Sequence, residues 1–489
     1  MKEKIRKEIN KDIDDNISYL KEMFKDTSDI IFREFYIGDI KAFLMYIDGM
    51  ADKILLNDYV LESLMIQSKD VENLDNIEDI KNNILTVTDL TEIKEFNKGV
   101  NSMLSGDTLM LVDGCTEGYV IATRFWPARG ISEPSSETVV KGSRDGFSET
   151  IRFNTALIRR RIRDTRLKLV SKSLGERSKT DVVVTYIDDI VNQDVLNKLN
   201  KRIDKIDIDA VLDSGYVEQF IEDSKWSPFP TTKTTQRPDV VASALYEGKI
   251  AILVDNSPFV IIVPTTLPSL FQSPDDYYQR WIYSSVVRVI RLLSIIISLT
   301  LPALYVAVTS YHVAIIPTKL AYFIASSREG VPFPAYMEAI IMDVSLALLM
   351  ESIVRLPKPI GATIGIVGGL IIGQAAVSAG IVSPIMIIIV SLTAITSFTA
   401  PNYEVSSAFR LIRFLLIIAS AFLGLYGIMI GLIILLIHLI RLKSFGIPYL
   451  APAVNSSTED FKDMFIRLHL KFFKHRPKYM KTKDKIRQK

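Results

Sequence analysis

Cysteine and histidine are scarce in this chain of 489 residues. The single cysteine, Cys115, excludes an intramolecular disulfide framework, a CxxC redox pair and a thiolate metal cluster. The four histidines are too few and too scattered along the sequence to form a histidine-based metal centre: His312, His438, His469 and His475. We therefore expect no bound metal and no cofactor.

Sequence signatures of catalysis are also missing. The chain has no GxxxxGK[ST] phosphate loop, no HExxH zinc motif and no GxSxG nucleophile elbow. The stretch SLGERSKT around Gly175 lacks the adjoining Gly-Lys pair that a phosphate loop requires. The 58 basic and 56 acidic residues leave a net charge of +2. A net charge this small does not attract nucleic acid to the chain as a whole. We expect a protein that is not an enzyme and does not bind nucleic acid.

Charge and hydrophobicity are segregated along the chain. Hydrophobic residues make up 48% and charged residues 23% of the sequence, and the mean hydropathy is +0.23. Nearly all long apolar runs follow Trp281, and the segment before it is charged. The first residues, MKEKIRKEINKDIDDNISYLKEMF, lack the apolar core of a signal peptide. The pattern predicts a cytoplasmic α/β domain followed by an α-helical polytopic membrane domain.

Five hydrophobic segments are long enough to cross a bilayer, whose core of roughly 30 Å requires about 20 apolar residues per helix. They cover approximately residues 289–310, 336–354, two segments within 360–400 that break near Ser383-Pro384, and 412–440. Basic residues flank the first two segments, and the tail after Arg441 is also basic, so both ends are expected inside. An even number of crossings then favours four over five, with one segment re-entrant or interfacial.

Three carboxylates interrupt the second hydrophobic segment: Glu338, Asp343 and Glu351. Asp343 lies roughly 10 Å into a helix that starts at Tyr336, where a carboxylate is costly unless it faces water or a partner, or is protonated. At about 100° per residue, Asp343 and Glu351 can share a face that Glu338 cannot join. Two interpretations stay open. The segment is an interfacial helix with solvated carboxylates, Glu338 and Glu351 reaching the interfaces, or Asp343 lines an aqueous pathway for cations.

Small residues recur at GxxxG spacing in the hydrophobic half. Glycines four residues apart let helix backbones approach closely in a membrane. This packing fits contacts within one subunit or between the subunits of an oligomer, and the sequence does not choose between them. The residues concerned are Gly361, Gly365, Gly369, Gly373, Gly427 and Gly431.

The charged half alternates helical and strand-like patterns, which indicates two α/β subdomains that meet near residues 127–142. Periodicity predicts mostly helix up to about residue 96, including residues 30–65, and another helix over 149–173. Residues 107–126 read as a hairpin that turns around Cys115, and TDVVVTYID reads as a strand. Helices are expected near 193–206 and 216–223, and GKIAILVDNSPFVIIVP reads as two strands. The basic run from Arg159 to Lys168 is expected to be a solvated helix face or to approach lipid headgroups.

Several long strings resemble the A subunits of GerA-type spore germinant receptors, over roughly residues 133–477. The strings are EPSSETVVKGSRDGFSE, NTALIRRRI, LDSGYVEQFIEDSKWSPFPTTKTTQRPD, ASSREGVPFPAYMEA, RLPKPIGATIGIVGGLIIGQAAVSAGIVSP, SFTAPNYE and LKSFGIPYLAP. One departure is KGSRDGF, where the family has RGPREGF, so that Ser143 replaces a proline.

The resemblance implies a multi-pass protein of the inner spore membrane that acts in nutrient-triggered germination. It implies assembly with a transporter-like B subunit and a lipoprotein C subunit, and a homo-oligomer, expected to be a pentamer, that forms a germinant-gated cation channel. A related protein, stage V sporulation protein AF, shares this architecture and acts in ion release without sensing nutrient. That alternative stays open, as does a scaffold that conducts nothing. A secondary transporter is less consistent, because the apolar segments show no internal repeat.

These expectations place candidate residues in both halves of the chain. We expect domains at 1–130, 131–285 and 286–443, and a basic cytoplasmic tail at 444–489. The membrane pathway candidates are Asp343, Glu351, Gln374, Asn402 and Glu338. The candidates for conformational coupling or subunit contact are Glu133, Arg144, Asp145, Glu149, Arg237 and Asp239, for which salt bridges and helix caps are the alternative roles.

Overall fold

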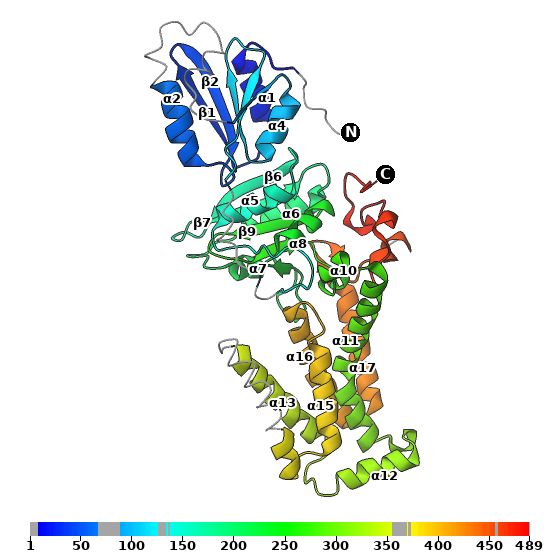
Figure 1. Cartoon of the computed structure of the whole chain (residues 1–489). Helices are drawn as coiled ribbons and strands as arrows, with labels where there is room; N and C mark the ends of the chain where they lie inside the picture. The colour runs from blue at the N-terminus through cyan, green and yellow to red at the C-terminus, as the bar shows by residue number, and fades with distance from the viewer. Residues whose placement is uncertain are drawn as a thin grey trace. The chain divides into compact units, whose positions relative to one another are not determined.

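The computed structural model describes residues 8–66, 89–125, 134, 137–354, 369, 373–454 and 458–488. The chain forms two compact units. The α/β unit comprises Met1–Glu222, Thr232–Pro264 and Lys474–Lys489, and the helical unit comprises Asp223–Thr231 and Thr265–Phe473. Sheets and helices build the first unit, and helices dominate the second (Figure 1). The predicted order, an α/β part followed by a helical part, is confirmed.

The first half of the α/β unit is an antiparallel sheet of five strands, in the order β1-β2-β4-β5-β3, with helices on both faces (Figure 1). Alternate residues of its central strands enter two cores: Phe43 and Leu111 face one side, and Leu44 and Met110 the other. The strands are β1 (Ile30–Ile37), β2 (Ile40–Ile47), β3 (Leu90–Ile93), β4 (Thr108–Val112) and β5 (Gly118–Ile121). The helices are α1 (Ile13–Met23) and α4 (Phe96–Leu104) on the first side, and a π-helical turn (Leu55–Leu61) with α2 (Glu62–Met65) on the second.

The helix predicted over residues 30–65 is wrong for its first half, which is the β1–β2 hairpin. Gly38 has φ +59° and opens a two-residue turn, so that Ile37 pairs with Ile40. Both faces of β2 are buried, from Ala42 to Met45, so its sequence shows no alternation. A strand covered on both sides reads as a continuous apolar run, which periodicity alone does not distinguish from a helix.

The second half of the α/β unit is another antiparallel sheet, in the order β6-β7-β9-β10-β8. Helices α5 and α8 share one core with β6, β7, β9 and β10, and α7 contacts β10 and α6. The strands are β6 (Leu167–Leu174), β7 (Thr180–Ile187), β8 (Lys233–Thr235), β9 (Ile250–Val254) and β10 (Val260–Val263). The helices are α5 (Ile151–Arg161), α6 (Gln193–Ile203), α7 (Ser214–Ile221) and α8 (Pro238–Tyr246).

Most elements expected in this region are confirmed. The hairpin around Cys115 is β4–β5, the strand TDVVVTYID is β7, and GKIAILVDNSPFVIIVP forms β9 and β10. The helix expected over 149–173 is wrong in its second half, because α5 ends at Arg161. Asp164 then closes a turn by accepting from the Arg166 backbone N–H at 3.0 Å, and β6 pairs along its whole length with β7.

The helical unit packs around one long helix, α11 (Trp281–Ser310), which contacts five other helices of the unit. Small residues allow this packing: Ala303 and Ala307 of α11 share a core with Ala335, Ala339 and Ala408. The other helices in the described part of this unit are α9 (Leu267–Leu270), α10 (Asp275–Tyr278), α12 (Thr318–Ser327), α13 (Ala335–Val354), α15 (Pro384–Ser397), α16 (Tyr403–Leu423) and α17 (Leu425–Arg441). A two-stranded ribbon follows, β11 (Lys443–Ser444) with β12 (Ile447–Pro448). Short 3-10 turns lie at Val313–Ile315, Thr458–Asp463 and Leu470–Phe472, and a further one, Lys478–Met480, belongs to the α/β unit.

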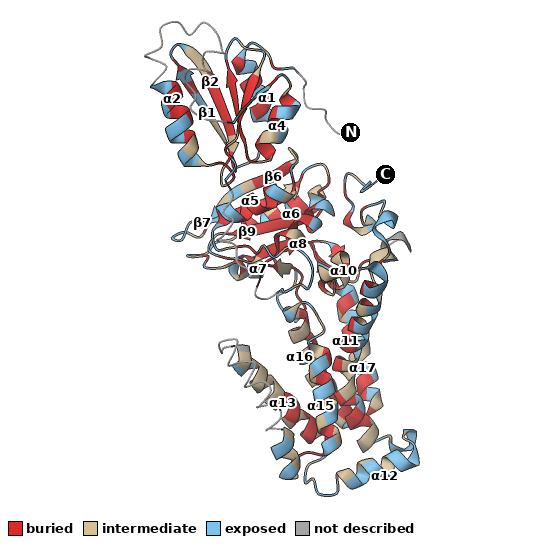
Figure 2. Cartoon of the chain, viewed as in Figure 1, coloured by how far each residue is buried: buried red, intermediate tan, exposed pale blue. Residues whose placement is uncertain are grey.

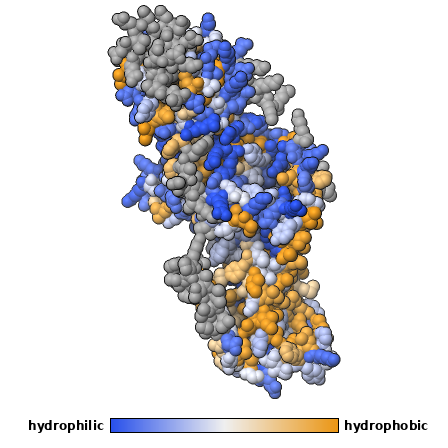
Figure 3. Space-filling view, viewed as in Figure 1, coloured by the Kyte–Doolittle hydropathy of each residue, from blue (hydrophilic) through white to orange (hydrophobic). Residues whose placement is uncertain are grey.

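Two of these helices, α11 and α16, are long and apolar enough to cross a membrane, within the part of the chain that the structure describes. Hydrophobic surface is concentrated over the helical unit, where many large apolar side chains are exposed (Figure 3). Buried positions lie along α11, and α12 has none (Figure 2). Exposed apolar surface of this extent is typical of a membrane or protein contact.

The hydrophobic segment expected to span residues 412–440 as one helix is instead a hairpin of α16 and α17. Gly424 lies between them with φ +59° and ψ −135°, a conformation that L side chains rarely adopt. The two helices pack side by side, with Gly427 against Ala419 and Gly431 against Leu416. The expectation of one continuous helix here is therefore wrong, because a single glycine reverses the chain inside an apolar run.

The C-terminal tail is divided between the two units. Residues up to Phe473 belong to the helical unit, and those after it to the α/β unit. Arg476 donates to the backbone oxygen of Tyr246 at 2.8 Å, and the Lys483 N–H donates to the Ile190 oxygen at 3.2 Å. The described end of the tail is therefore held by backbone contacts.

Candidate functional site

The carboxylate of Glu338 lies in the first turn of α13 and connects three segments of the helical unit. Its side chain is fully buried. One carboxylate oxygen accepts from Arg328 Nε at 3.1 Å, and the other accepts from the Ser383 backbone N–H at 2.9 Å. Ser383 itself caps α15. Glu338 was expected to reach the polar interface of the membrane. In the structure its carboxylate is instead buried inside the helical unit and hydrogen-bonded to Arg328 and Ser383.

Asp343 lies about one and a half turns further along α13 and is paired with a residue of α16. Arg413 Nη2 donates to Asp343 Oδ1, and both side chains are more than nine-tenths buried. A buried guanidinium neutralises the carboxylate and lowers the cost of burying it. In this arrangement the carboxylate of Asp343 is neutralised by Arg413, and the ion pair connects α13 to α16.

The other pathway candidates lie apart from this pair. Glu351 is exposed near the end of α13, and Gln374 is exposed in the short helical stretch before Gly380. Asn402 caps α16 by accepting from the Val405 N–H at 3.1 Å. The structure therefore does not gather the predicted polar residues into one site.

The predicted glycine contacts differ from one position to the next. A Cβ on Gly427 would lie 2.2 Å from the backbone oxygen of Ala419, and one on Gly431 would lie 2.4 Å from Leu416 Cδ2. A Cβ on Gly373 would make ordinary contact with Ile387, and one on Gly369 would meet none of the described residues within 4 Å. Gly361 and Gly365 lie outside the described residues.

In the α/β unit, Arg237 organises the loop that carries the KGSRDGF string. It is completely buried, and its guanidinium donates to the backbone oxygens of Glu137 and Ser143 and to the carboxylate of Asp239, at 2.8–3.2 Å. The Thr235 hydroxyl donates to Glu137 at 2.6 Å, and burial nevertheless raises the pKa of the Glu137 carboxyl. Arg237 and Asp239 therefore join the loop to the start of α8.

The remaining predicted coupling residues surround the same loop. Asp145 accepts from Arg161 Nη2 at 2.9 Å, and Arg161 also donates to the Ser143 hydroxyl at 3.0 Å. The side chains of Arg144 and Glu149 are exposed. Glu133 lies outside the described residues.

The basic run expected to be a solvated helix face contains a buried residue. Arg159 is fully buried, and its Nε and Nη2 donate to the two carboxylate oxygens of Asp29 at 2.7 and 3.0 Å. This pair joins α5 of the second sheet to the start of β1 in the first. The expectation of a solvated face is wrong for Arg159, since Asp29 supplies a buried partner 130 residues away in sequence.

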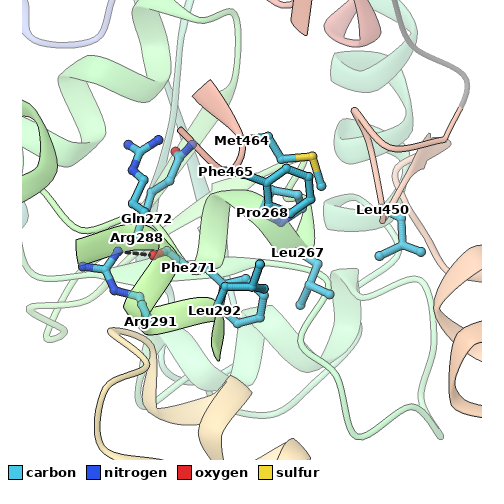
Figure 4. A pocket seen from close by; sticks show the side chains of 10 residues that line it. All are labelled: Leu267, Pro268, Phe271, Gln272, Arg288, Arg291, Leu292, Leu450, Met464 and Phe465. Atoms are coloured by element: carbon cyan, nitrogen blue, oxygen red, sulfur yellow. Dashed lines mark hydrogen bonds between the residues drawn. The ribbon is translucent and has the colours of Figure 1, made fainter. Parts of the chain in front are cut away.

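A pocket of about 160 Å³ lies beside the second and third turns of α11 in the helical unit. The polar ends of Gln272, Arg288 and Arg291 gather on one side of it (Figure 4). Apolar side chains form the other side: Leu267, Pro268, Leu292, Leu450, Met464 and Phe465. Arg288 and Arg291 both pair with Asp276, which is itself buried.

Sequence reasoning missed the partners of the buried carboxylates. Arg413 interrupts an apolar run. A charged residue in such a segment indicates that it has a partner of opposite charge or faces a polar cavity. Its partner Asp343 is 70 residues away, and no local pattern connects them. Among the described residues, no group of three or more His, Cys, Asp or Glu side chains could hold a metal ion.

Comparison with known proteins identifies the family. The family model described as the Bacillus/Clostridium GerA spore germination protein matches residues 18–479. The chain belongs to this family. It is 42% identical over 442 residues to spore germination protein GerLA of Bacillus cereus, which covers 90% of this chain and 89% of that relative. It is 41% identical over 488 residues to spore germination protein B1 of Bacillus subtilis, with 98% and 100% covered.

This GerA-family chain also resembles a solved structure, the N-terminal domain of the A subunit of the Bacillus megaterium spore germinant receptor GerK3. The two are 36% identical, with a TM-score of 0.42, and the likeness covers 53% of this chain and 97% of that domain. The family match over residues 18–479 confirms, at the level of the family, the resemblance inferred from the sequence strings.

Proposed function

We propose that this chain is the membrane-embedded A subunit of a nutrient germinant receptor that triggers spore germination. The observation that carries the proposal is the family match across residues 18–479, with near-complete coverage of relatives named as spore germination proteins. The partners are a transporter-like B subunit and a lipoprotein C subunit, and the location is the inner spore membrane with the α/β unit on the cytoplasmic side. The expected domain boundaries, at residues 130, 285 and 443, belong to the same proposal.

The helical unit supports insertion in a membrane. Helices α11 and α16 are long enough to cross it, and α13, α15 and α17 add further apolar helices. Apolar side chains such as Leu411, Leu415 and Phe422 of α16 are exposed, which is unfavourable in water and neutral in lipid. The proposed unit is polytopic, with an even number of crossings that keeps both ends of the chain on one side.

Within this receptor the chain forms a homo-oligomer, expected to be a pentamer, that conducts cations when germinant is bound. A carboxylate paired with a guanidinium attracts a cation only weakly, because the positive charge beside it cancels most of its potential at a distance. Separation of α13 from α16 would free Asp343 from Arg413 and give a pathway its negative charge. Glu351 and Gln374 are exposed pathway candidates, whereas Glu338 and Asn402 hold helix ends. Arg144 and Glu149 are the exposed candidates for subunit contact.

The first test is potassium release from dormant spores that lack the gene, after addition of a panel of nutrients. Loss of release for some nutrients and not others is the expected result for a receptor subunit. Uniformly slower release for every nutrient would instead indicate a channel like stage V sporulation protein AF, which amplifies ion release without sensing nutrient. Unchanged release for every nutrient would count against both roles.

The second test is cation flux through the purified chain in liposomes. A conducting oligomer carries flux without partner subunits, and an assembly scaffold carries none. The double variant Asp343→Asn with Arg413→Gln removes both charges together, so it avoids leaving one charge buried alone. We expect it to lower the cation flux, with Glu329→Gln as the control at an exposed carboxylate of the helical unit that is not a pathway candidate. Normal flux through the double variant would overturn the pathway role of Asp343.

A further inference from the structure

An apolar groove of about 490 Å³ runs along the hairpin of α16 and α17 in the helical unit. We call it the hairpin groove. Leu416 and Leu435 line it and are buried, whereas Leu415, Ile430 and Ile434 line it and are at least half exposed. The groove therefore has an apolar base between the two helices and is open at the surface.

The length of the hairpin groove matches one leaflet of a bilayer. Gly427 and His438 both line it, and they lie eleven residues apart on α17, which is about 16 Å along the helix. Half of a hydrocarbon core of roughly 30 Å is about 15 Å. A single acyl chain of a membrane lipid therefore fits the groove from end to end.

Only one end of the hairpin groove is polar. There, Ser227 Oγ lies 2.9 Å from His438 Nε2, within hydrogen-bonding distance. Trp226 also lines this end, and its side chain is 97% exposed. Tryptophan is enriched where a membrane meets water, because its ring is apolar and its N–H is polar. The Trp226 end is therefore suited to the level of the lipid headgroups.

Basic residues flank this polar end. Residues 223–230 and 438–445 contain three Lys or Arg and one Asp, a net charge of +2 with His438 neutral. The carboxylate of Asp223 accepts from the Phe445 backbone N–H. The basic side chains are exposed, and the phosphate of an anionic lipid complements their charge: Lys225, Arg441 and Lys443.

A lipid chain suits the hairpin groove better than another helix does. Helices in a membrane approach most closely where small residues face each other. Gly427 and Gly431 already serve this purpose within the hairpin, against α16. The exposed sides of the groove carry branched side chains such as Leu415 and Ile434, which keep a second helix backbone at a distance. A flexible acyl chain can adapt to these side chains.

We propose that the hairpin groove binds one acyl chain of an anionic phospholipid. The chain extends from His438 toward Gly427, and the headgroup lies at the Trp226 end. The proposal rests on the proposed insertion of the helical unit in a membrane and goes beyond it, since insertion alone assigns no lipid to a particular site. The bound chain gives the residues of the groove van der Waals partners and so stabilises the packing of α17 on α16.

The test is native mass spectrometry of the full-length chain in detergent, with dipalmitoyl phosphatidylglycerol as the probe. We expect one lipid to bind saturably, at least about tenfold more tightly than the zwitterionic dipalmitoyl phosphatidylcholine. Glycerol 3-phosphate, which carries the charge without the chains, should not displace it. Absence of saturable binding would overturn the proposal, as would equal binding of the two lipids or displacement by glycerol 3-phosphate.

Variants decide whether the lipid lies in the hairpin groove. The double variant Leu415→Trp with Ile434→Trp narrows the groove from both helices, and we expect it to weaken lipid binding at least about tenfold. The double variant Leu411→Trp with Ile437→Trp is the matched control, because these residues are 61% and 48% exposed and do not line the groove. Equal binding by the two double variants would overturn the assignment.

The charged end has a separate variant. Arg441→Gln, one turn beyond His438 on α17, should reduce the preference for phosphatidylglycerol over phosphatidylcholine. Lys319→Gln, at an exposed lysine of α12, is the control. An unchanged preference in Arg441→Gln would contradict the placement of the headgroup at this end.

Crosslinking locates the chain even if the groove-filling variant does not fold. Phosphatidylglycerol with a diazirine at the end of one acyl chain should label peptides around Gly427 in the wild-type chain, and labelling only elsewhere would overturn the proposal. Sedimentation with carbonate-washed membranes tests insertion separately, and potassium release from spores tests the receptor role. A chain that remains inserted but retains no lipid would overturn the groove assignment alone.

Discussion

Arg413 on α16 donates a hydrogen bond to the carboxylate of Asp343 on α13, and both side chains are buried in the helical unit. The pair joins two helices that approach each other through an otherwise apolar core. Glu338, one and a half turns before Asp343, is held by Arg328 and by the start of α15. Helix α13 is therefore attached by two buried carboxylates as well as by apolar packing.

Removal of one charge of the Asp343–Arg413 pair is expected to destabilise the helical unit. Asp343→Asn leaves the Arg413 guanidinium buried without its counter-charge, which costs about 3–5 kcal/mol in comparable pairs. The double variant Asp343→Asn with Arg413→Gln should recover much of this loss, since no charge remains buried alone. Thermal unfolding in detergent measures both, with Glu351→Gln as the control on the same helix. If the single and double variants unfold at the same temperature, the two residues are not coupled.

The Asp29–Arg159 pair is expected to stabilise the junction of the two sheets in the α/β unit. Arg159→Gln leaves Asp29 buried and unpaired, with an expected cost of about 3–5 kcal/mol. Hydrogen exchange of the full chain should then become faster in peptides from β1 and α5. Lys21→Gln, which removes an exposed ion pair with Glu34, is the control and should change exchange little. Unchanged exchange in Arg159→Gln would contradict a stabilising role for the pair.

The two glycines of α17 are expected to respond differently to alanine. In Gly427→Ala the new Cβ meets the backbone oxygen of Ala419 at 2.2 Å, so the helices must separate, at an expected cost of about 1–3 kcal/mol. In Gly431→Ala the Cβ meets only the end of the Leu416 side chain, which can move, and alanine favours helix by about 1 kcal/mol over glycine. Thermal unfolding should therefore rank Gly427→Ala well below Gly431→Ala. Equal unfolding temperatures would indicate that α16 and α17 are not packed closely here.

The stability of the α/β unit is expected to depend on the ionisation of Glu218. Burial raises the pKa of this carboxyl, although the Thr232 hydroxyl donates to it. Because the folded state holds the proton more tightly than the unfolded state, stability is greatest below the unfolded pKa of about 4.3 and falls as pH rises through the folded pKa. Glu218→Gln should remove this part of the pH dependence.

Urea unfolding followed by hydrogen exchange in α7 peptides, at pH 5 and pH 7.5, measures the effect of Glu218. The wild-type chain should lose more stability between these two values than the Glu218→Gln variant. Glu176→Gln, at an exposed carboxylate of the same unit, is the control. A steeper pH dependence in Glu218→Gln than in the wild type would show that the sign is wrong.

Local sequence patterns were sufficient to predict those elements whose structure is determined by their own residues. The β4–β5 hairpin, β7, α6 and the β9–β10 pair follow from alternation, apolar runs and turn residues, and the family follows from long strings such as the one around Arg237. The break at Ser383-Pro384 is likewise local, since Ser383 caps α15 and proline is favoured in the first turn. The order of a charged α/β part and an apolar helical part was already evident from composition.

Tertiary structure decided the rest, because the outcome depended on partners distant in sequence. Residues 30–47 carry helix-like apolar spacing, and they form a hairpin because helices cover both faces of its sheet. The run at 412–440 is uniformly apolar, so only the packing of α17 against α16 shows that Gly424 reverses the chain. The charges of Asp343 and Arg159 were readable in the sequence, but Arg413 and Asp29 lie 70 and 130 residues away from them. A buried charge requires a partner, and the fold alone determines which residue supplies it.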